Sequence, residues 1–383
     1  MNQFSFSGMG AVSFGIDRIK QLAEDILTLN GSRVPVVLIS DAGVAGAGIL
    51  APIKSIVERA GHPLTTLCDL DGEPHAGTVD QAAEAIRRCG RPCVIGLGGG
   101  SALDVAKLSA IIAQDAHPAE EYALCARPFK KPELVRIMIP TTAGTGTEVT
   151  RTATFTNHAG HKVWAWGPQL VPDLVILDPC LTVSLPAQVT AVTGLDALVH
   201  AIEACTCRQR NIISDALGLH AIRLVSRNLV TAIERPEDLT ARSGMQIAAT
   251  LAGSAFAQTG TAGAHAIGHA LATIAGVPHG LAVALAMVAL LEWNEAALPE
   301  LHTAVAQALA GPDPAGGASS AFSSLVDQTG MSRSLAEKAI DPTALAALMM
   351  SEENLPMAEN NVRPITKSDA LELAKRTLGG LGI

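Results

Sequence analysis

The sequence predicts an α/β domain with a mostly parallel sheet, followed by an all-α domain. A chain of 383 residues, 48% of them hydrophobic, is long enough to bury two cores. Short β-branched runs alternate with helical segments up to about residue 180, which is typical of an α/β unit. Beyond that point, Ala- and Leu-rich segments of helical length dominate. We therefore expect one domain over residues 1–180 and a second over residues 181–383.

Within the first domain, short apolar runs predict strands and the longer amphipathic segments between them predict helices. The expected strands are residues 35–40, 64–70, 92–100, 134–142 and 174–179. The expected helices are residues 48–61, 79–90 and 101–114. The second domain should open with a helix near Pro186, because Ser184 fits an N-cap and proline is tolerated in a first helical turn.

The amino-acid composition limits the kinds of molecule that the protein can bind. The formal net charge is −9 and only 16% of residues are charged, so the chain lacks the basic surface that nucleic acid or anionic lipid requires. The longest apolar run, residues 281–291, is too short to span a bilayer, and the N-terminus lacks a signal-peptide pattern. Seven scattered cysteines fit a reducing compartment. We expect a cytoplasmic protein with a small-molecule partner, no nucleic acid and no membrane.

A glycine-rich turn follows the third expected strand, in "VIGLGGGSALDVAK" (94–107). Gly98 and Gly99 allow close approach of a ligand to the backbone, and the next helix opens with Ser101 and Asp104 at capping-box spacing. The N-terminus of a helix favours an anion, so this segment is a candidate pyrophosphate site. The run does not complete the G-x-G-x-x-G fingerprint, and a tight strand-to-helix turn without a ligand fits it as well.

Two further features lie at the ends of expected strands, where ligands bind in open α/β sheets. The stretch "PTTAGTGTEVT" (140–150) offers several threonine hydroxyls, although an ordinary Thr-rich loop has the same composition. Asp41 ends the first strand, where a carboxylate accepts hydrogen bonds from an adenosine ribose and repels a 2′-phosphate. That role predicts NAD, with NADP less favoured. An aspartate that merely caps the following turn also fits.

Histidines and an aspartate recur at helical spacing in the second domain. "GAHAIGHALATIAGVPHG" (263–280) contains His265 and His269 four residues apart, and His279 at a new helix start. Asp196 and His200 are also four apart, so each pair lies on one face of its helix. Aspartate with three histidines suits a divalent first-row metal with open positions. Each histidine alone also fits a buried, hydrogen-bonded core residue.

Five ordered motifs together resemble the iron-dependent (group III) alcohol dehydrogenases, whose fold is shared with glycerol dehydrogenase and dehydroquinate synthase. The motifs are "DGEPHAGTVD" (71–80), "GGGSALDVAK" (98–107), "PTTAGTGTEVT" (140–150), "TGLDALVHAIEA" (193–204) and "HAIGHALATIAGVPHG" (265–280). The resemblance implies an N-terminal dinucleotide-binding domain and a C-terminal metal-binding, catalytic domain. It also implies an NAD- and Fe²⁺-dependent enzyme that transfers hydride between a cofactor and a small alcohol or aldehyde, commonly as a homo-dimer or larger oligomer.

The resemblance also implies roles for individual residues. It assigns the metal to Asp196, His200, His265 and His279, and a proton relay near the metal and nicotinamide to His269. Gly98, Gly99 and Ser101 match the pyrophosphate loop, Thr141, Thr142 and Thr145 match cofactor-facing hydroxyls, and Asp41 matches the ribose-binding acid. Lys162 matches a position near the cofactor, Thr152 one near the substrate, and Phe256 a wall of the substrate pocket.

Several alternatives remain at this stage. Zn²⁺ or another divalent metal fits the same ligands, because Zn²⁺ binds nitrogen and oxygen donors more tightly than Fe²⁺. A lyase like dehydroquinate synthase would need basic groups for a phosphorylated substrate. A metal-independent reductase related to maleylacetate reductase would not need the aspartate and histidines. A non-enzymatic metal- or nucleotide-binding protein is the third alternative.

Overall fold

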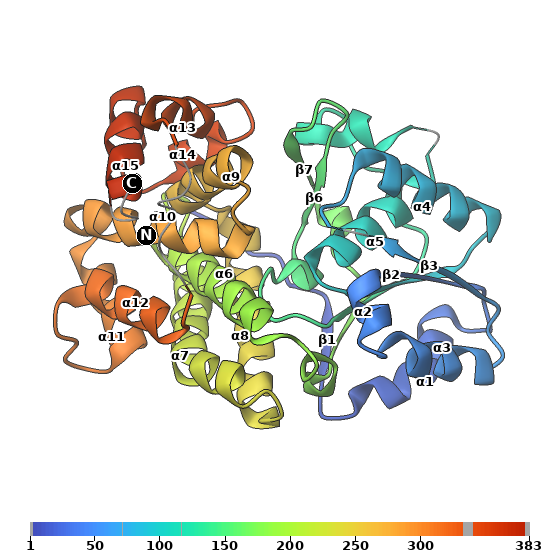
Figure 1. Cartoon of the computed structure of the whole chain (residues 1–383). Helices are drawn as coiled ribbons and strands as arrows, with labels where there is room; N and C mark the ends of the chain where they lie inside the picture. Colours follow the sequence, from blue (N-terminus) through green and yellow to red (C-terminus); the bar gives the residue numbers. More distant parts are fainter. Residues whose placement is uncertain (1–2, 71, 116, 332–339, 380–383) are drawn as a thin grey trace. The chain divides into compact units, whose positions relative to one another are not determined.

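The computed structural model describes residues 3–70, 72–115, 117–331 and 340–379, and the chain divides into two compact units (Figure 1). The α/β unit comprises Gly8–Thr142 and Gly146–Ser184. The helical unit comprises Leu185–Ile383 with Met1–Ser7 and Ala143–Thr145. The expected single boundary near residue 180 therefore misplaces Met1–Ser7 and Ala143–Thr145, which belong to the helical unit. Asp71, the first residue of one quoted motif, lies outside the described residues.

The α/β unit is built on a six-stranded sheet in the order β1-β8-β5-β4-β2-β3, in which every neighbouring pair is parallel. The strands are β1 (Ala11–Phe14), β2 (Val36–Asp41), β3 (Leu64–Leu70), β4 (Cys93–Gly98), β5 (Arg136–Pro140) and β8 (Leu174–Leu177). This confirms the five expected strands and the parallel sheet. The short edge strand β1 was not expected, because its exposed tetrapeptide resembles neither a buried run nor a long amphipathic strand.

Helices cover both faces of this sheet, which explains why its central strands are apolar throughout. Alternate residues point to opposite faces: Val36 and Leu38 pack with one group of helices, and Val37 and Ile39 with another. The first group is α1 (Leu22–Asn30) and α3 (Leu50–Arg59); the second is α4 (Ala76–Arg88) and α5 (Gly100–Ile112). Shorter helices are α2 (Ala42–Gly46), η1 (Arg18–Gln21), η2 (Ala119–Cys125), η3 (Thr147–Val149), η4 (Pro168–Leu170) and η5 (Pro179–Thr182).

A two-stranded antiparallel hairpin, β6 (Thr152–Thr156) and β7 (Lys162–Trp166), also belongs to this unit and was missed from the sequence. It packs Phe155 and Val163 into the core that contains α5. The alternation Thr-Ala-Thr-Phe-Thr is the period-2 signal that predicts such a strand. The hairpin decides where Thr152 and Lys162 lie.

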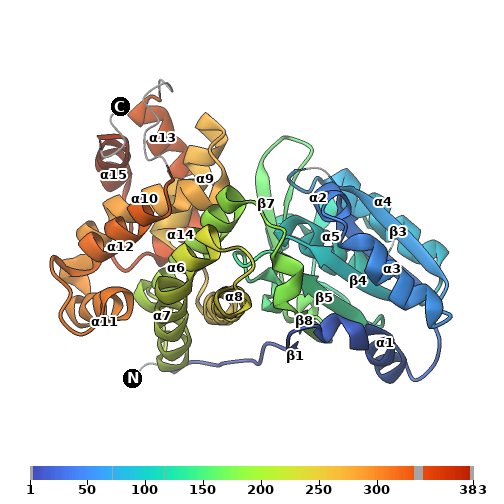
Figure 2. The same cartoon turned by 60° about the horizontal axis from the view of Figure 1, so that its bottom comes forward.

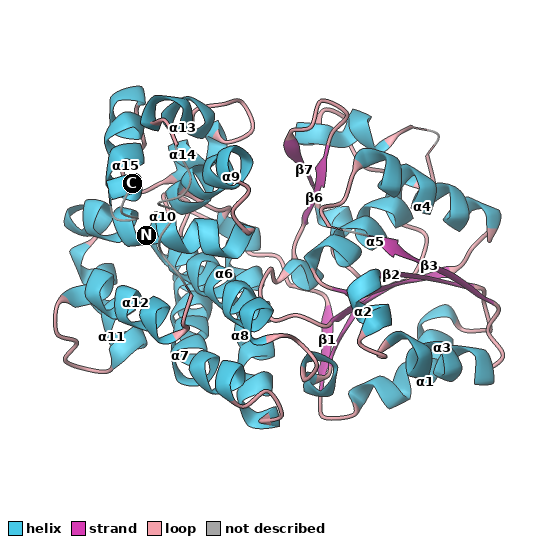
Figure 3. Cartoon of the chain, viewed as in Figure 1, coloured by secondary structure: helices cyan, strands magenta, loops and turns pink. Residues whose placement is uncertain are grey.

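The second unit is entirely helical among the named elements, as expected, and all eight named strands lie in the first unit (Figure 3). Its helices are α6 (Ala187–Thr206), α7 (Ile212–Glu234), α8 (Leu239–Thr259), α9 (Gly263–Ala275), α10 (His279–Asn294), η6 (Glu295–Ala297), α11 (Pro299–Ala310), α12 (Gly317–Gln328), α13 (Pro342–Met349), α14 (Leu355–Asn360) and α15 (Lys367–Gly379). Figure 2 shows α6, α7 and α8 side by side. A Cβ at Gly218 of α7 would lie 2.8 Å from the Ala201 carbonyl oxygen, so glycine permits the close approach to α6.

Two expected helix caps are wrong. Helix α6 begins at Ala187 after Pro186, and Ser184 does not cap it. Helix α5 begins at Gly100, so its N-cap residue is Gly99, which has no side chain, and the expected cap Ser101 lies inside the helix. Asp104 is hydrogen-bonded in an internal network instead.

In the described part of the chain, two helices are long and apolar enough to cross a membrane by length and composition, Ala187–Thr206 and His279–Ala297. The second helix contains the apolar run 281–291, which by itself is too short to span a bilayer. The most apolar 18-residue window of each helix is 83% buried in the first and 67% buried in the second, which is typical of core helices.

Candidate metal centre and cofactor loop

One face of helix α6 carries Asp196, His200 and Glu203, at positions i, i+4 and i+7 of the helix. All three side chains are buried. The rest of this helix is dominated by small and aliphatic residues, so these polar groups stand in an apolar interior. Buried polar groups need partners, and the polar side chains nearest to these three lie on helices α9 and α10.

The remaining candidates come from the junction of α9 and α10. His265 and His269 lie one turn apart on α9, and His279 is the first residue of α10. Gly268 allows the two helices to approach closely, because a Cβ there would lie 2.9 Å from the Val283 Cα. The turn between the helices thus returns His279 to the neighbourhood of the other two histidines.

The side chains converge on the Asp196 carboxylate. Its Oδ1 lies 3.5 Å from His279 Nε2, 3.7 Å from His200 Nδ1 and 3.9 Å from His265 Nε2. Ligand atoms of Asp196, His265 and His279 all lie within 4.8 Å of one another. His200 adjoins this group through its Nε2, which lies 3.0 Å from His265 Nε2. The four groups predicted to hold a metal therefore lie together.

The arrangement fits a cation. Asp196 Oδ1 is buried and has no hydrogen-bond partner in the described part of the chain, which is costly for a carboxylate oxygen. Imidazole nitrogens and a carboxylate oxygen are ligands that a divalent first-row metal accepts. The His279 side chain keeps 24% of its surface exposed, whereas those of Asp196, His200 and His265 are buried, so the cluster has one partly open side.

The two other predicted residues of this region, His269 and Phe256, lie beside the cluster. The Phe256 ring stacks on that of His200, with centroids 4.3 Å apart and planes 18° from parallel. The His269 ring lies 5.1 Å from that of His279 and 5.8 Å from that of His265. His269 is thus close to two predicted ligands without belonging to the group of three.

Sequence reasoning missed Glu203. Its Oε2 lies 2.6 Å from His265 Nδ1, inside the same buried region. Burial by itself would raise the pKa of Glu203, but the His265 charge and the hydrogen bonds from His265 and Ala262 outweigh it and hold the pKa below the ordinary value. The signal was available in "HAIEA", because position 203 continues the spacing of Asp196 and His200 on an apolar helix.

Burial also controls the protonation of His200. Loss of hydration lowers its pKa from 6.5 to about 4, against smaller raising effects of Asp196 and Glu203. His200 is therefore a neutral imidazole at pH 7, which is the form that binds metals.

This pKa difference predicts acid sensitivity of the metal-free protein. Between pH 6.5 and about 4, the unfolded chain binds a proton at residue 200 that the folded chain refuses, so the free energy of unfolding should fall as the pH falls through this window. Urea denaturation at pH 6.5 and 4.5 measures the effect. His200→Gln should show a smaller decrease than the parent, and His220→Gln, a change on the exposed face of α7, should retain the parental decrease. Equal decreases in all three proteins would contradict the assignment.

The glycine loop between β4 and α5 lies against the end of β2. Gly98 has φ +152°, and a Cβ there would overlap Asp41 Oδ2 and approach the Ala102 Cβ to 2.8 Å. A Cβ at Gly99 would lie 3.4 Å from the Thr142 side chain. The structure thus brings four of the predicted cofactor residues together, and backbone N–H groups at the start of α5 lack a side-chain cap.

The other residues predicted for the cofactor and substrate are placed as follows. One Asp41 oxygen accepts a hydrogen bond from the Val44 backbone and caps α2, while the other faces the glycine loop. Lys162 pairs with Glu73 at 2.9 Å. Thr141 donates its backbone N–H to the Gly98 carbonyl. Ser101 lies in the first turn of α5, Thr145 groups with the helical unit, and Thr152 begins the hairpin.

Asp104 lies in a buried network under the threonine loop. It accepts hydrogen bonds from the Thr147 hydroxyl and from the backbone and hydroxyl of Thr154, and it pairs with Lys107 at 3.4 Å. Lys107 Nζ faces oxygens of Thr147, Thr150 and Thr152. Asp104 thus joins α5 to the loop and the hairpin.

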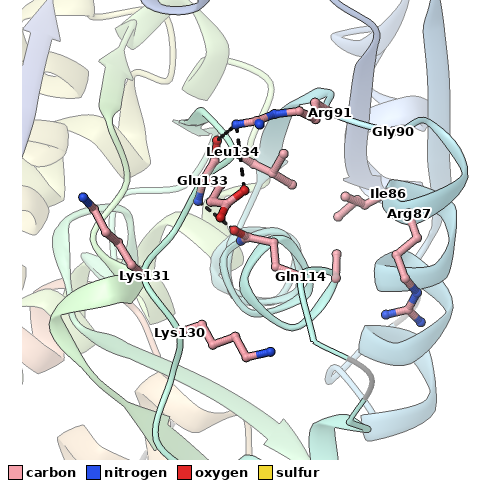
Figure 4. Close-up of a pocket in the computed structure, with 10 residues that line it drawn as sticks. Ile86, Arg87, Gly90, Arg91, Gln114, Lys130, Lys131, Glu133 and Leu134 are labelled. Atoms are coloured by element: carbon pink, nitrogen blue, oxygen red, sulfur yellow. Dashed lines mark hydrogen bonds and ion pairs between the residues drawn. The ribbon is translucent and has the colours of Figure 1, made fainter.

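A surface pocket of about 270 Å³ lies in the α/β unit, between the ends of α4 and α5 (Figure 4). Its lining includes Lys131 and three other cationic side chains that are paired with carboxylates. The pairs are Arg87 with Glu84, Arg91 with Glu133 and Lys130 with Asp115. No predicted site residue lines it, and we assign it no ligand.

Comparison with known proteins gives a family for both halves of the chain. The model of iron-containing alcohol dehydrogenases matches residues 10–179, and the model of the C-terminal part of that family matches residues 190–378. The chain is 33% identical over 303 residues to a sulfoacetaldehyde reductase of Bilophila wadsworthia, covering 79% of this chain and 78% of the other. It is 35% identical over 302 residues to a choline dehydrogenase of Bacillus subtilis, covering 78% and 74%.

Solved structures of the same family share the fold of this chain over nearly its whole length. The sulfoacetaldehyde reductase of Bifidobacterium kashiwanohense in complex with NAD⁺ superposes with a TM-score of 0.89 at 27% identity, covering 99% of both chains. A 1,3-propanediol oxidoreductase superposes with a TM-score of 0.88 at 27% identity, covering 98% of this chain and all of the other. With the parallel sheet, the helical unit and the buried aspartate–histidine cluster, these matches show that the chain belongs to the iron-containing alcohol dehydrogenase family, the oxidoreductases that act on the CH–OH group of alcohols.

Proposed function

We propose that this chain is an NAD- and Fe²⁺-dependent dehydrogenase that interconverts a small alcohol and its aldehyde. The observation that carries the proposal is the convergence of Asp196, His265 and His279 within 4.8 Å of one another, beside His200. The metal-independent reductase considered from the sequence would not need this cluster, and the lyase would in addition need basic groups for a phosphorylated substrate.

In this proposal, Asp196, His200, His265 and His279 hold the metal. When bound, the metal supplies Lewis acidity to the substrate oxygen, and the nicotinamide supplies or accepts the hydride. The chain's own residues prepare this chemistry. His200 stays neutral because it is buried, and the Phe256 ring covers one face of it. His269, beside two of the proposed ligands, is our candidate for the proton relay.

Metal reconstitution tests the function. The protein is stripped with a chelator and reloaded anaerobically with Fe²⁺ or Zn²⁺, and NADH is followed at 340 nm. The substrate panel holds neutral, anionic and cationic alcohols and aldehydes, because the relatives' names span sulfoacetaldehyde, choline and 1-propanol. Metal-dependent turnover supports the proposal. Turnover without metal, or none while the metal and NAD are both bound, contradicts it.

The cofactor specificity follows from Asp41, in our proposal. Its Oδ2 faces the glycine loop, where a carboxylate accepts hydrogen bonds from a ribose and repels a 2′-phosphate. Asp41→Gly should therefore lower the NAD/NADP ratio of kcat/KM, measured by initial rates with each cofactor. The cap on Val44 is lost as well, so Asp41→Asn, which keeps a capping oxygen without the charge, is the matched control. An unchanged ratio in both variants would rule out the ribose role.

We also propose that the protein is a cytoplasmic homo-oligomer. None of its seven cysteines forms a disulfide in the described chain, as in reducing compartments. Strand β1 lies at an edge of the sheet and exposes apolar side chains, with Val12 38% and Phe14 44% exposed, and Ile16 just beyond it is 59% exposed. Two copies of one edge strand pair antiparallel across a two-fold axis, so the edge suits a second copy of this chain.

Light scattering tests the oligomer. We expect a mass of two chains or more for the parent and of one chain for Phe14→Glu, because the variant places like charges across the two-fold axis. Leu27→Glu, on an equally exposed leucine of α1, should leave the parental mass unchanged. A parental mass of one chain would contradict the proposal.

A further inference from the structure

The buried carboxylate of Glu203 has four nitrogen partners, all at or before the first turn of α9. Its Oε1 accepts hydrogen bonds from the backbone N–H of Ala264 at 2.7 Å and of His265 at 3.2 Å. Its Oε2 accepts from the backbone N–H of Ala262 at 2.8 Å and lies 2.6 Å from His265 Nδ1. Four donors therefore surround one carboxylate, which is a full set of partners for its two oxygens.

Three of these contacts replace a missing helix cap. Helix α9 begins after Ala262, which has no side-chain acceptor, and its first turn contains no acidic residue. The N–H groups of a first turn have no partner within their own helix and favour a negative charge. Glu203, on α6, supplies both the hydrogen-bond acceptors and the negative charge. It therefore holds the start of α9 against the helix that carries Asp196 and His200.

The fourth contact decides which nitrogen of His265 carries the proton. An ionised carboxylate only accepts hydrogen bonds, so Nδ1 of His265 must donate to Glu203. When the ring is neutral, the form that binds a metal, its Nε2 presents a lone pair, and this is the nitrogen that lies among Asp196, His200 and His279. Outer carboxylates that bind the far nitrogen of a histidine in this way orient metal ligands.

We propose that Glu203 is a positioning residue for the metal centre, which locks His265 in the tautomer and orientation that present Nε2 to the metal. The inference rests on the proposed metal site and extends it by one residue. It makes the start of α9 and the affinity for metal depend on the same carboxylate.

Glu203→Gln separates this role from simple capping. Glutamine retains the hydrogen bonds from the backbone N–H groups of Ala264 and His265 only if its oxygen takes the Oε1 position, because the reverse orientation sets its NH₂ against both. In the retained orientation the NH₂ takes the Oε2 position and faces His265 Nδ1. Nδ1 must then accept a hydrogen bond, so the proton moves to Nε2 and blocks the ligand nitrogen. We expect Zn²⁺ affinity to fall by about 10–100-fold, the usual effect of losing an outer-shell partner.

The experiment measures Zn²⁺ binding to the parent and variants by competition with a chromophoric chelator, with urea denaturation of the metal-free proteins alongside. Long-range ¹H–¹⁵N spectra of ¹⁵N-histidine-labelled, metal-free protein report the tautomer of residue 265. We expect Nδ1–H in the parent and Nε2–H in Glu203→Gln. Asp215→Asn, a change to another buried carboxylate that pairs with Arg210, is the control for lost stability and should retain parental Zn²⁺ affinity.

The outcomes are distinguishable. Weaker Zn²⁺ binding with an altered tautomer supports the inference. If Glu203→Gln is destabilised yet binds Zn²⁺ as tightly as the parent, Glu203 is a helix cap alone and the inference fails. If the parent itself binds neither Zn²⁺ nor Fe²⁺, the proposed metal site fails first, and the inference with it.

Discussion

Replacing His265 by alanine is expected to remove the metal from the protein while leaving its fold and its affinity for NAD in place. The imidazole Nε2 lies in the cluster with Asp196 and His279, and a methyl group offers no ligand atom in its place. The loss of metal affinity should exceed the roughly 10–100-fold that removal of an outer-shell partner causes. Glu203 retains three backbone donors in this variant, so the start of α9 should persist.

Metal content after dialysis against a chelator, NAD binding by fluorescence and circular dichroism measure the three properties. His269→Ala is the matched control on the same helix: it should retain the metal and lose activity, because His269 lies beside the cluster and is proposed to move a proton. If His265→Ala lost NAD affinity as severely as metal, the assignment of the cofactor loop and the metal ligands to separate units would be wrong.

Replacing Lys107 by methionine should produce the largest loss of stability in the α/β unit. The ammonium group is fully buried, pairs with Asp104 and donates to the loop and hairpin that follow β5. Burial lowers the pKa of Lys107, partly offset by the charge and hydrogen bond of Asp104. Methionine fits the space but leaves the Asp104 charge without its cation, which costs about 3–5 kcal/mol for a buried pair.

Urea denaturation measures this change in the free energy of unfolding. Lys131→Met, the same substitution on an exposed side chain, should change it by less than about 0.5 kcal/mol. The double variant Asp104→Asn/Lys107→Met should lose less than the two single variants add up to, because it removes both members of the pair. Additive losses would show that Lys107 and Asp104 act independently.

The five expected strands of the sheet and the pairs Asp196/His200 and His265/His269 were predictable, because their signals are spacings between near neighbours. A helix turns through a set angle per residue, so residues four apart share a face wherever the helix packs. The same argument fails for the N-cap expected at Ser184, because α6 begins two residues later, and for the capping box expected at Asp104, whose carboxylate binds other partners.

Asp104 illustrates the competition. Its spacing from Ser101 suits a helix cap, yet its carboxylate turns to Thr147 and Thr154, 43 and 50 positions away along the chain. Thr147 belongs to η3, and Thr154 reaches Asp104 because the hairpin Thr152–Trp166, itself missed, folds against α5. A polar group that is buried takes whichever partners the packing brings to it.

The strand and helix pattern, the parallel sheet and the residues able to bind a metal were predictable from the chain, because each depends on local spacing and side-chain chemistry. Which of these residues meet depends on long-range packing: it brought His279 to Asp196, set Asp41 against Gly98, and placed Glu203 on His265, 62 positions away. Local periodicity orients a side chain on its own element, whereas packing between distant elements determines what that side chain touches.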